Sequence, residues 1–365
     1  MTSDPSNAVV HLTLRRGENE LAVGSGVLYR KDDKTYIVTA WHNVTGRHSE
    51  NLKPLSKTTA AFPDNLIAYI SCNFFYPNAQ FGSLRRPFTI QLENADQALY
   101  LIHPQGYPRV DVVAIPIDPG YLYDSVGELS TGGKVNVPLP MRQEPLGIGL
   151  GSDINCIQDF EQSASELNID FENNLTVSDD LFILGYPKGI IDVSGQPLWK
   201  RATVASAPHL GWNRQKQFLV DCASREGMSG APAIFHSKAG AVRVGGSVHV
   251  GVQIVTFLAG IYVGRVGQVS NFEAQIGTIW QRSVIDEIIE KAVIAPHSSQ
   301  VEAMPEEIHS VIENKWPAED DYASKILVEG HFINYYIHDV MKTLNGRADP
   351  DKVKEKIFGL ARSKI

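Results

Sequence analysis

The chain has 365 residues, with 33 Lys and Arg against 41 Asp and Glu, which gives a formal net charge of −8. Hydrophobic residues make up 43% and charged residues 20%, a balance that excludes global disorder and allows a large buried core. A mildly acidic chain without a long basic run is a poor electrostatic match for nucleic acid or an anionic membrane. Neither is therefore an expected partner.

The cysteines and the N-terminus indicate a compartment. The three cysteines, Cys72, Cys156 and Cys222, are widely spaced and include no Cys-x-x-Cys pair, which argues against a disulfide framework or a zinc ribbon. Residues 1–7 have no basic stretch leading into an apolar one, as a secretory signal would. No segment is apolar for about 18 residues, the length of a membrane span. We therefore expect a reducing, cytoplasmic location.

The first third of the chain has the pattern of β-strands. Residues 9–14 alternate apolar and polar side chains, and residues 36–40 are rich in β-branched types, with a polar turn before them. Further strand patterns cover residues 66–70 and 110–115. The sequence therefore predicts an antiparallel β unit over about residues 8–118.

Short strand patterns resume after an irregular tract at residues 118–180, which we expect to be a long connection. The predicted strands of this second stretch cover residues 181–186, 218–220, 233–235, 248–255 and 260–263. Many short strands separated by Gly and Pro favour an all-β barrel or sandwich.

The pattern becomes helical near residue 279. Val284, Ile285, Ile288 and Ile289 recur at helical spacing, and residues 295–299 then have the composition of a linker. Beyond it the sequence predicts three helices. The first begins at Pro305, a longer one runs from about Asp321 to the Asn-Gly pair at 345–346, and the last begins at the Asp-Pro pair at 349–350.

Three polar residues stand where nucleophilic catalysis would need them. Ser229 lies in a Gly-flanked turn just ahead of a predicted strand, His42 ends a β run, and Asp111 interrupts an apolar strand. A serine hydroxyl needs a base, and the base needs a partner that sets its tautomer. Taken singly, each residue is better explained as a turn serine, a packed histidine or an edge-strand acid. The three together indicate a catalytic triad.

In this setting the chain resembles the trypsin-like (chymotrypsin-clan) serine peptidases. Thr-Ala-x-His stands at 39–42, Asp-Val-Val-Ala-Ile at 111–115 and Gly-x-Ser-Gly-x-Pro at 227–232, in the family's order. Two further segments resemble motifs of the bacterial high-temperature-requirement proteases. They are the strand that ends in Gly-Tyr-Pro-Lys-Gly at 185–189 and the Gly-Ser-Gly at 24–26. No peptide-carboxylate-binding module of the kind those proteases append is recognisable.

The resemblance implies an all-β fold of two six-stranded antiparallel β-barrels, with a closing helix and a C-terminal helical appendage. The peptidase domain would span residues 1–294, of which 8–118 would form the first barrel and 119–294 the second barrel and closing helix. Residues 300–365 would be the helical region. These helices are the predicted site of association with a partner or with a second copy of the chain.

The resemblance also implies a role for each site residue. His42 would be the general base, Asp111 would orient it, and Ser229 would form an acyl-enzyme with a protein or peptide substrate. The backbone N–H groups of Gly227 and Ser229 would form the oxyanion hole. The substrate pocket would be lined by Ala223, Val263, Gly264 and Arg265.

Two departures from the pattern bear on activity. Met228 stands where zymogen-type members carry an acid that pairs with a freed N-terminus, so this mode of activation is not expected. Ala223 stands where an acid selects basic side chains, so the pocket should not favour Lys or Arg.

The sequence leaves one alternative open and argues against others. A catalytically silent peptide-binding protein of the same fold would have the same strands, but it would usually lack a triad member. An esterase of the α/β-hydrolase class would need Gly-x-Ser-x-Gly, and position 231 is Ala. The 11 histidines include no His-Glu-x-x-His, so we expect neither a metal nor any other cofactor.

Overall fold

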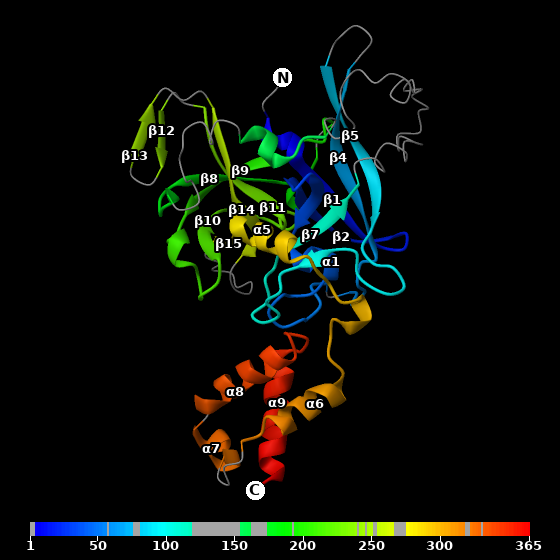
Figure 1. Ribbon diagram of the computed structural model, residues 1–365, viewed down its shortest axis with the longest axis vertical. Coiled ribbons are helices and arrows are strands. Elements are labelled where there is room, and N and C mark those ends of the chain that lie inside the picture. The colour runs from blue at the N-terminus through cyan, green and yellow to red at the C-terminus, as the bar shows by residue number, and fades with distance from the viewer. Residues whose placement is uncertain are drawn as a thin grey trace.

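Two β units lie side by side in the computed structural model, and a helical unit lies at one end of the molecule (Figure 1). The structure describes residues 4–56, 58–75, 81–118, 154–161, 174–191, 193–238, 241–244, 247–250, 254–265, 275–317, 322–329 and 331–365. Most of the tract at 118–180, predicted to be a long connection, falls outside these ranges.

The N-terminal unit is an antiparallel sheet of eight strands in the order β16-β6-β7-β3-β2-β1-β4-β5. Its strands are β1 (Val9–Arg16), β2 (Asn19–Lys31), β3 (Lys34–Thr39), β4 (Asn65–Phe75), β5 (Phe81–Gln91), β6 (Leu101–Ile102), β7 (Val113–Ile117) and β16 (Val293–Ile294). The helix α1 (Trp41–Thr45) follows β3 almost directly. Because side chains alternate along a strand, Val10, Leu12 and Leu14 of β1 enter one core while Val9 enters another.

The second unit is a closed barrel of six strands in the order β10-β15-β14-β11-β8-β9. These are β8 (Asp180–Gly185), β9 (Leu198–Val204), β10 (Gln217–Asp221), β11 (Ala231–Ser237), β14 (Val255–Arg265) and β15 (Ile276–Gln281), and a separate hairpin joins β12 (Ala241–Val244) to β13 (Ser247–Val250). Closure gives every barrel strand a paired neighbour on each side.

A shared core holds the two units together. Val9, Val27 and Val38 of the first unit pack in one apolar cluster with barrel residues such as Leu184 and Ile234, all of them fully buried. The helix α5 (Arg282–Lys291) closes this core with the four apolar residues that the sequence placed on one face, all of them buried. The site described below lies where the two units meet.

The predicted all-β, chymotrypsin-like architecture is therefore confirmed, with its closing helix and C-terminal helices. The second predicted barrel is closed by six strands, and the first unit is an eight-stranded sheet. Its edge is extended by β16, which follows α5 and pairs with β6, so the chain returns from the barrel to the first unit. Short 3₁₀ turns complete the β part at η1 (Pro5–Ala8), η4 (Ile157–Phe160), η5 (Pro187–Gly189), η6 (Pro208–Leu210) and η7 (Ser298–Gln300).

The C-terminal unit has its own core, built around fully buried residues such as Ile312, Val340 and Ile357. Its helices are α6 (Pro305–Asn314), α7 (Tyr322–Glu329), α8 (His331–Thr343) and α9 (Pro350–Ser363). The long helix predicted from Asp321 onward was wrong as a single element, because it is divided into α7 and α8. The sequence has Gly330 between them, and glycine costs a helix about 1 kcal/mol relative to alanine.

One buried histidine makes the stability of the fold depend on pH. His11 of β1 is 6% exposed, packs edge-on against the rings of Tyr69 and Tyr186, and has no hydrogen-bond partner for either ring nitrogen. Burial, with a smaller contribution from the charge of Arg85, lowers the pKa of His11 to about 4. Above pH 6.5 the imidazole is neutral in both the folded and the unfolded chain.

We predict that this difference destabilises the fold in acid. Between pH 6.5 and 4 the unfolded chain binds a proton at His11 and the folded chain does not, so the free energy of unfolding falls by ~3 kcal/mol. His11→Phe should lose that part of the pH dependence, measured by urea unfolding at pH 7 and pH 4. The exposed His209→Phe is the matched control and should behave like the wild type. An unchanged pH dependence in His11→Phe would contradict the assignment.

Candidate active site

His42 and Asp111 are joined side chain to side chain. His42 lies in the first turn of α1, and Asp111 lies just before β7. His42 Nδ1 is 2.8 Å from Asp111 Oδ2, the backbone N–H of His42 donates to Oδ1 at 3.0 Å, and the two side chains are only 13% and 10% exposed. A carboxylate that accepts from Nδ1–H selects the tautomer in which Nε2 carries the lone pair. His42 can therefore act as a base through Nε2.

A buried carboxylate is costly unless it is hydrogen-bonded or paired with a positive charge. Besides the two hydrogen bonds from His42, Asp111 has the buried guanidinium of Arg109 nearby. Burial lowers the pKa of Arg109 to about 10, and the charge of Asp111 opposes that shift. Arg109 is therefore still charged at neutral pH, and its charge lies beside the carboxylate of Asp111.

Ser229 is held in its turn by glycines that no other residue could replace without a clash. Gly227 and Gly230 have φ angles of +87° and +86°, in the left-handed region. A Cβ on Gly227 would lie 2.4 Å from the carbonyl oxygen of Tyr186, and one on Gly230 would lie 2.1 Å from that of Ser25. Both the backbone conformation and the packing therefore require glycine here.

Polar residues of the N-terminal unit position this serine turn from the other side of the unit boundary. The carbonyl oxygen of Ser229 accepts hydrogen bonds from the N–H of Ser25 at 2.9 Å and from Asn43 Nδ2 at 2.8 Å. Ser25 Oγ donates to the carbonyl of Gly227 at 2.7 Å, and Thr39 Oγ1 donates to the carbonyl of Ser25 at 2.7 Å. Sequence analysis missed these positioning roles, although Ser25 lies within Gly-Ser-Gly and Asn43 follows His42.

The three predicted triad residues line one cavity of about 790 Å³. The whole lining comprises His42, His48, Ser49, Glu50, Asn51, Leu55, Tyr107, Pro108, Arg109, Asp111, Trp212, Asn213, Gln215, Gln217, Ser229, Val263, Gly264, Arg265, Thr278, Trp280, Pro350 and Asp351. These residues come from both β units and from the start of α9. The structure thus brings together side chains that are far apart in the sequence.

The hydroxyl of Ser229 donates to the carbonyl oxygen of Val263 at 3.3 Å. In the part of the chain that is described, no hydrogen bond joins this hydroxyl to His42. Nor do the N–H groups of Gly227 and Ser229 donate to any described residue. Ser229 lines the cavity, whereas Gly227 is buried and does not belong to the lining.

The structure places three of the four predicted pocket residues in the cavity and one outside it. Val263, Gly264 and Arg265 line the cavity beside Ser229, whereas Ala223 is exposed and does not line it. Its neighbours Cys222 and Ser224 are each 2% exposed. Because side chains alternate along the extended chain that continues from β10, Ala223 is turned outward.

No protein family model matches the sequence, and no curated protein matches it significantly. Solved structures that are similar include the protease Rv3671c of M. tuberculosis in its inactive form, at 14% identity and a TM-score of 0.34 over 79% of this chain and 89% of that one. The serine endoprotease from Yersinia pestis shows 12% identity and a TM-score of 0.39 over 80% and 67% of the two chains. The protease Anisep from Arthrobacter nicotinovorans shows 15% and 0.35 over 78% and 93%.

These TM-scores are too low for the likenesses to decide the function, which has to be argued from the geometry of the site. Across the described ranges, no helix is long and apolar enough to cross a membrane. In the same residues, no group of three or more His, Cys, Asp or Glu side chains is arranged to hold a metal ion.

We predict that Ser25 holds the serine turn in place. Its side chain is fully buried and bonds both to the carbonyl of Gly227 and to the N–H of Tyr186. Ser25→Ala leaves both groups without a partner, which should lower the free energy of unfolding by ~1–3 kcal/mol. Urea unfolding measures this loss. Ser310→Ala, on the exposed side of α6, should change stability by less than ~0.5 kcal/mol, and an equal effect of the two variants would contradict the prediction.

Proposed function

We propose that this protein is a serine endopeptidase. The observation that carries the proposal is the 2.8 Å contact between His42 Nδ1 and Asp111 Oδ2, in a cavity that Ser229 also lines. The contact leaves His42 Nε2 as an acceptor facing that cavity, where a serine hydroxyl needs a base. In this proposal, residues 1–294 supply the catalytic chemistry and residues 300–365 form a separate helical region.

The chemistry follows from these positions. Ser229 Oγ attacks the carbonyl carbon of a peptide bond while His42 Nε2 takes its proton, and the resulting imidazolium is stabilised by Asp111. The N–H groups of Gly227 and Ser229 bind the oxyanion. The imidazolium then gives its proton to the leaving amine, and an acyl-enzyme remains on Ser229. Water repeats the sequence, releases the acid and restores the hydroxyl.

The barrel offers an edge where a peptide could lie. The pairing of β14 with β11 ends at Tyr262 opposite Ala231. Val263 and Gly264 continue past that point and line the cavity beside Ser229. A Cβ on Gly264 would lie only 3.9 Å from Ser229 Oγ. An extended peptide can add to such an edge through backbone hydrogen bonds, which supports a peptide substrate.

One observation favours the second candidate, a catalytically silent peptide-binding protein. The hydroxyl of Ser229 bonds to the carbonyl of Val263, and a nucleophile must turn from there toward His42 before it can react. Hydrogen bonds between catalytic groups are often long or misaligned without a substrate, so this rotamer is compatible with activity. A covalent label on Ser229 separates the two candidates.

We predict that a fluorophosphonate reacts with Ser229. The wild type should form one adduct, and Ser229→Ala should form none. His42→Ala should slow labelling by at least ~10³-fold because no base remains, and Asp111→Asn should slow it by up to ~10⁴-fold because an amide selects the wrong tautomer. Labelling rates are read from mass spectra of the intact protein.

Ser310→Ala, remote on α6, should label at the wild-type rate and serves as the control. A wild type that forms no adduct, or an adduct that persists in Ser229→Ala, would favour the silent binding protein instead.

We predict that cleavage will not favour Lys or Arg at the position that enters the pocket. The residues beside Ser229 that line the cavity are Val263, Gly264 and Arg265, of which none is acidic and one is positively charged. A cationic side chain would therefore find no carboxylate to pair with among these three residues. A peptide library with every residue type at that position measures the preference. Selective cleavage after Lys or Arg would contradict this view of the pocket.

A reducing, cytoplasmic setting remains part of the proposal. Within the described ranges, Cys72, Cys156 and Cys222 form no disulfide, and burial raises the pKa of the last two. Buried thiols of raised pKa are poorly reactive, which is compatible with cysteines that serve only as packed side chains.

A further inference from the structure

The turn between α8 and α9 meets the N-terminal unit backbone to backbone. Gly346 in this turn has a φ of +70°, and a Cβ there would lie 2.4 Å from the carbonyl oxygen of Gly106. A Cβ on Gly106 would in turn lie 2.9 Å from Asn345 Cα. No side chain separates the two segments at this point, so a shift of one requires a shift of the other.

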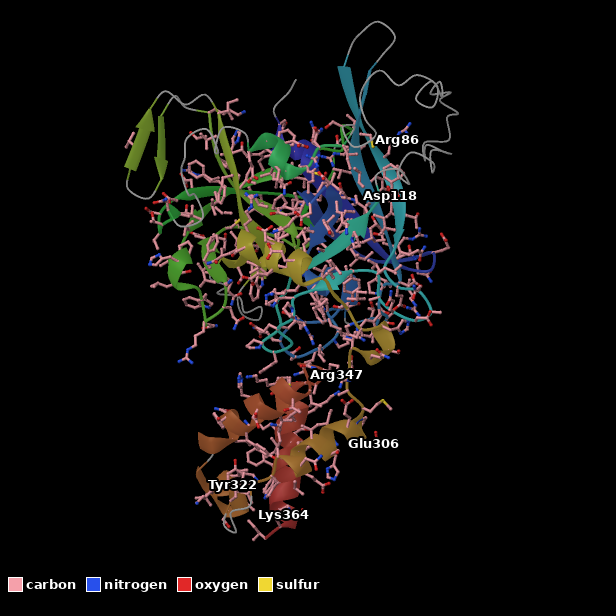
Figure 2. All side chains as sticks on the ribbon, viewed as in Figure 1. Arg86, Asp118, Glu306, Tyr322, Arg347 and Lys364 are labelled. Atoms are coloured by element: carbon pink, nitrogen blue, oxygen red, sulfur yellow. The ribbon has the colours of Figure 1, made fainter. Side chains whose placement is uncertain are left out.

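This turn lies at the end of the helical unit that faces the β units. Arg347, which follows Gly346, lies at that end, whereas Tyr322 and Lys364 lie toward the far end (Figure 2). An ion pair spans the same junction, with Lys53 Nζ 2.9 Å from the carboxylate of Asp351. Exposed ion pairs contribute little to stability, so the close backbone packing is the stronger constraint on the turn.

Arg109 carries this contact into the N-terminal unit. Its Nη2 donates to the carbonyl oxygen of Gly346 at 2.9 Å, and its Nη1 is buried with no hydrogen-bond partner among the described residues. The guanidinium lies over the ring of Trp41, 4.2 Å from the ring centre. A charged group that leaves water needs acceptors or an aromatic face. The carbonyl of Gly346 and the ring of Trp41 therefore set the position of the guanidinium.

The same guanidinium faces the cavity together with the carboxylate of Asp111. Val110 and Val112 are buried in the core that the two β units share, and Arg109 and Asp111 alternate with them and line the cavity. The charge of Asp111 opposes the fall in the pKa of Arg109 that burial causes. The two charged groups are therefore neighbours on one face of the chain.

Trp41 connects Arg109 to both members of the hydrogen-bonded pair. It is 4% exposed, it begins α1, and its backbone N–H donates to the carbonyl oxygen of Asp111 at 3.2 Å. The next residue, His42, makes both hydrogen bonds to the carboxylate of Asp111. The ring beneath the guanidinium thus belongs to a residue that is bonded covalently to the base and by a hydrogen bond to the acid.

We propose that Arg109 is a positioning residue for the pair of Asp111 and His42, and that the carbonyl of Gly346 in the helical unit holds it in place. The inference rests on the proposed function for the use that catalysis makes of the pair. If the turn moves away, Nη2 loses its acceptor and the guanidinium turns toward water in the cavity. Trp41 then loses the group stacked on it, and the two bonds from His42 to Asp111 loosen.

The first experiment measures fluorophosphonate labelling of Ser229 over a range of reagent concentrations. Arg109→Gln should lower the rate at saturation by ~10- to 100-fold, the effect of a small misplacement of catalytic groups. The half-saturating concentration should stay within ~2-fold, because a positioning residue does not bind the reagent. Arg201→Gln, which changes an exposed arginine of β9, is the matched control and should label like the wild type.

A second variant moves the turn and keeps the charge of Arg109. A Cβ on Gly346 would lie 3.3 Å from Arg109 Nη2 as well as against Gly106, so Gly346→Ala should lower the rate at saturation by ~10-fold. The double variant with Arg109→Gln should label no more slowly than the slower single variant, because both changes remove one contact. Gly359→Ala on α9, where a Cβ meets no atom within 4 Å, should have no effect.

Proton NMR of the whole chain tests the positioning without catalysis. The Nδ1–H proton of His42 is held in a hydrogen bond to a carboxylate, so it should give a downfield resonance that is protected from exchange with water. His42→Phe lacks this resonance and assigns it. Arg109→Gln and Gly346→Ala should broaden or lose it, whereas Arg201→Gln and Gly359→Ala should keep it. Urea unfolding confirms that each variant is folded.

Three results would overturn the proposal: a wild-type rate at saturation in Arg109→Gln, a loss confined to the half-saturating concentration, or a retained His42 resonance in both Arg109→Gln and Gly346→Ala. The second would make Arg109 a substrate contact. If Arg109→Gln does not fold, Gly346→Ala decides by the same criteria. A wild type that forms no adduct would refute the peptidase proposal alone, because the resonance of His42 does not depend on catalysis.

Discussion

The hydrogen-bonded pair of Asp111 and His42 is the constraint on which the rest of the site depends. A carboxylate that is only 10% exposed needs hydrogen-bond donors. His42 provides two, its Nδ1–H and its backbone N–H. The first turn of α1 and the start of β7 have to be adjacent for both bonds to form. The hydrogen bond from Nδ1 leaves Nε2 with the lone pair. The contact that satisfies the buried carboxylate of Asp111 therefore also sets the tautomer of His42.

The serine turn depends on contacts across the boundary between the two β units. Gly227 and Gly230 give it a left-handed backbone and room against Tyr186 and Ser25. Its carbonyl at Ser229 is then held by the N–H of Ser25 and by Asn43. The histidine and the residues that anchor the serine come from the same unit, in which α1 almost directly follows β3.

Arg109 extends this arrangement to the C-terminal helices. Its buried charge lies beside Asp111, and one of its hydrogen bonds goes to the carbonyl of Gly346. The helical unit and the pair of Asp111 and His42 therefore both lie against Arg109.

The sequence by itself determined several strands, such as β1, β3 and β8, together with the closing helix and the three polar residues, but it did not predict β5 or β9. Those it determined have a local cause: alternation of side chains, helical spacing, or glycines beside a serine. It did not determine that Ala223 faces outward, that α7 and α8 are separate, or that Ser25 and Asn43 anchor the turn. Only the tertiary structure placed Pro350 and Asp351 in the same cavity as His42. Such proximity results from long-range packing of backbone on backbone, as at Gly106 and Gly346, and leaves no periodic pattern in the chain.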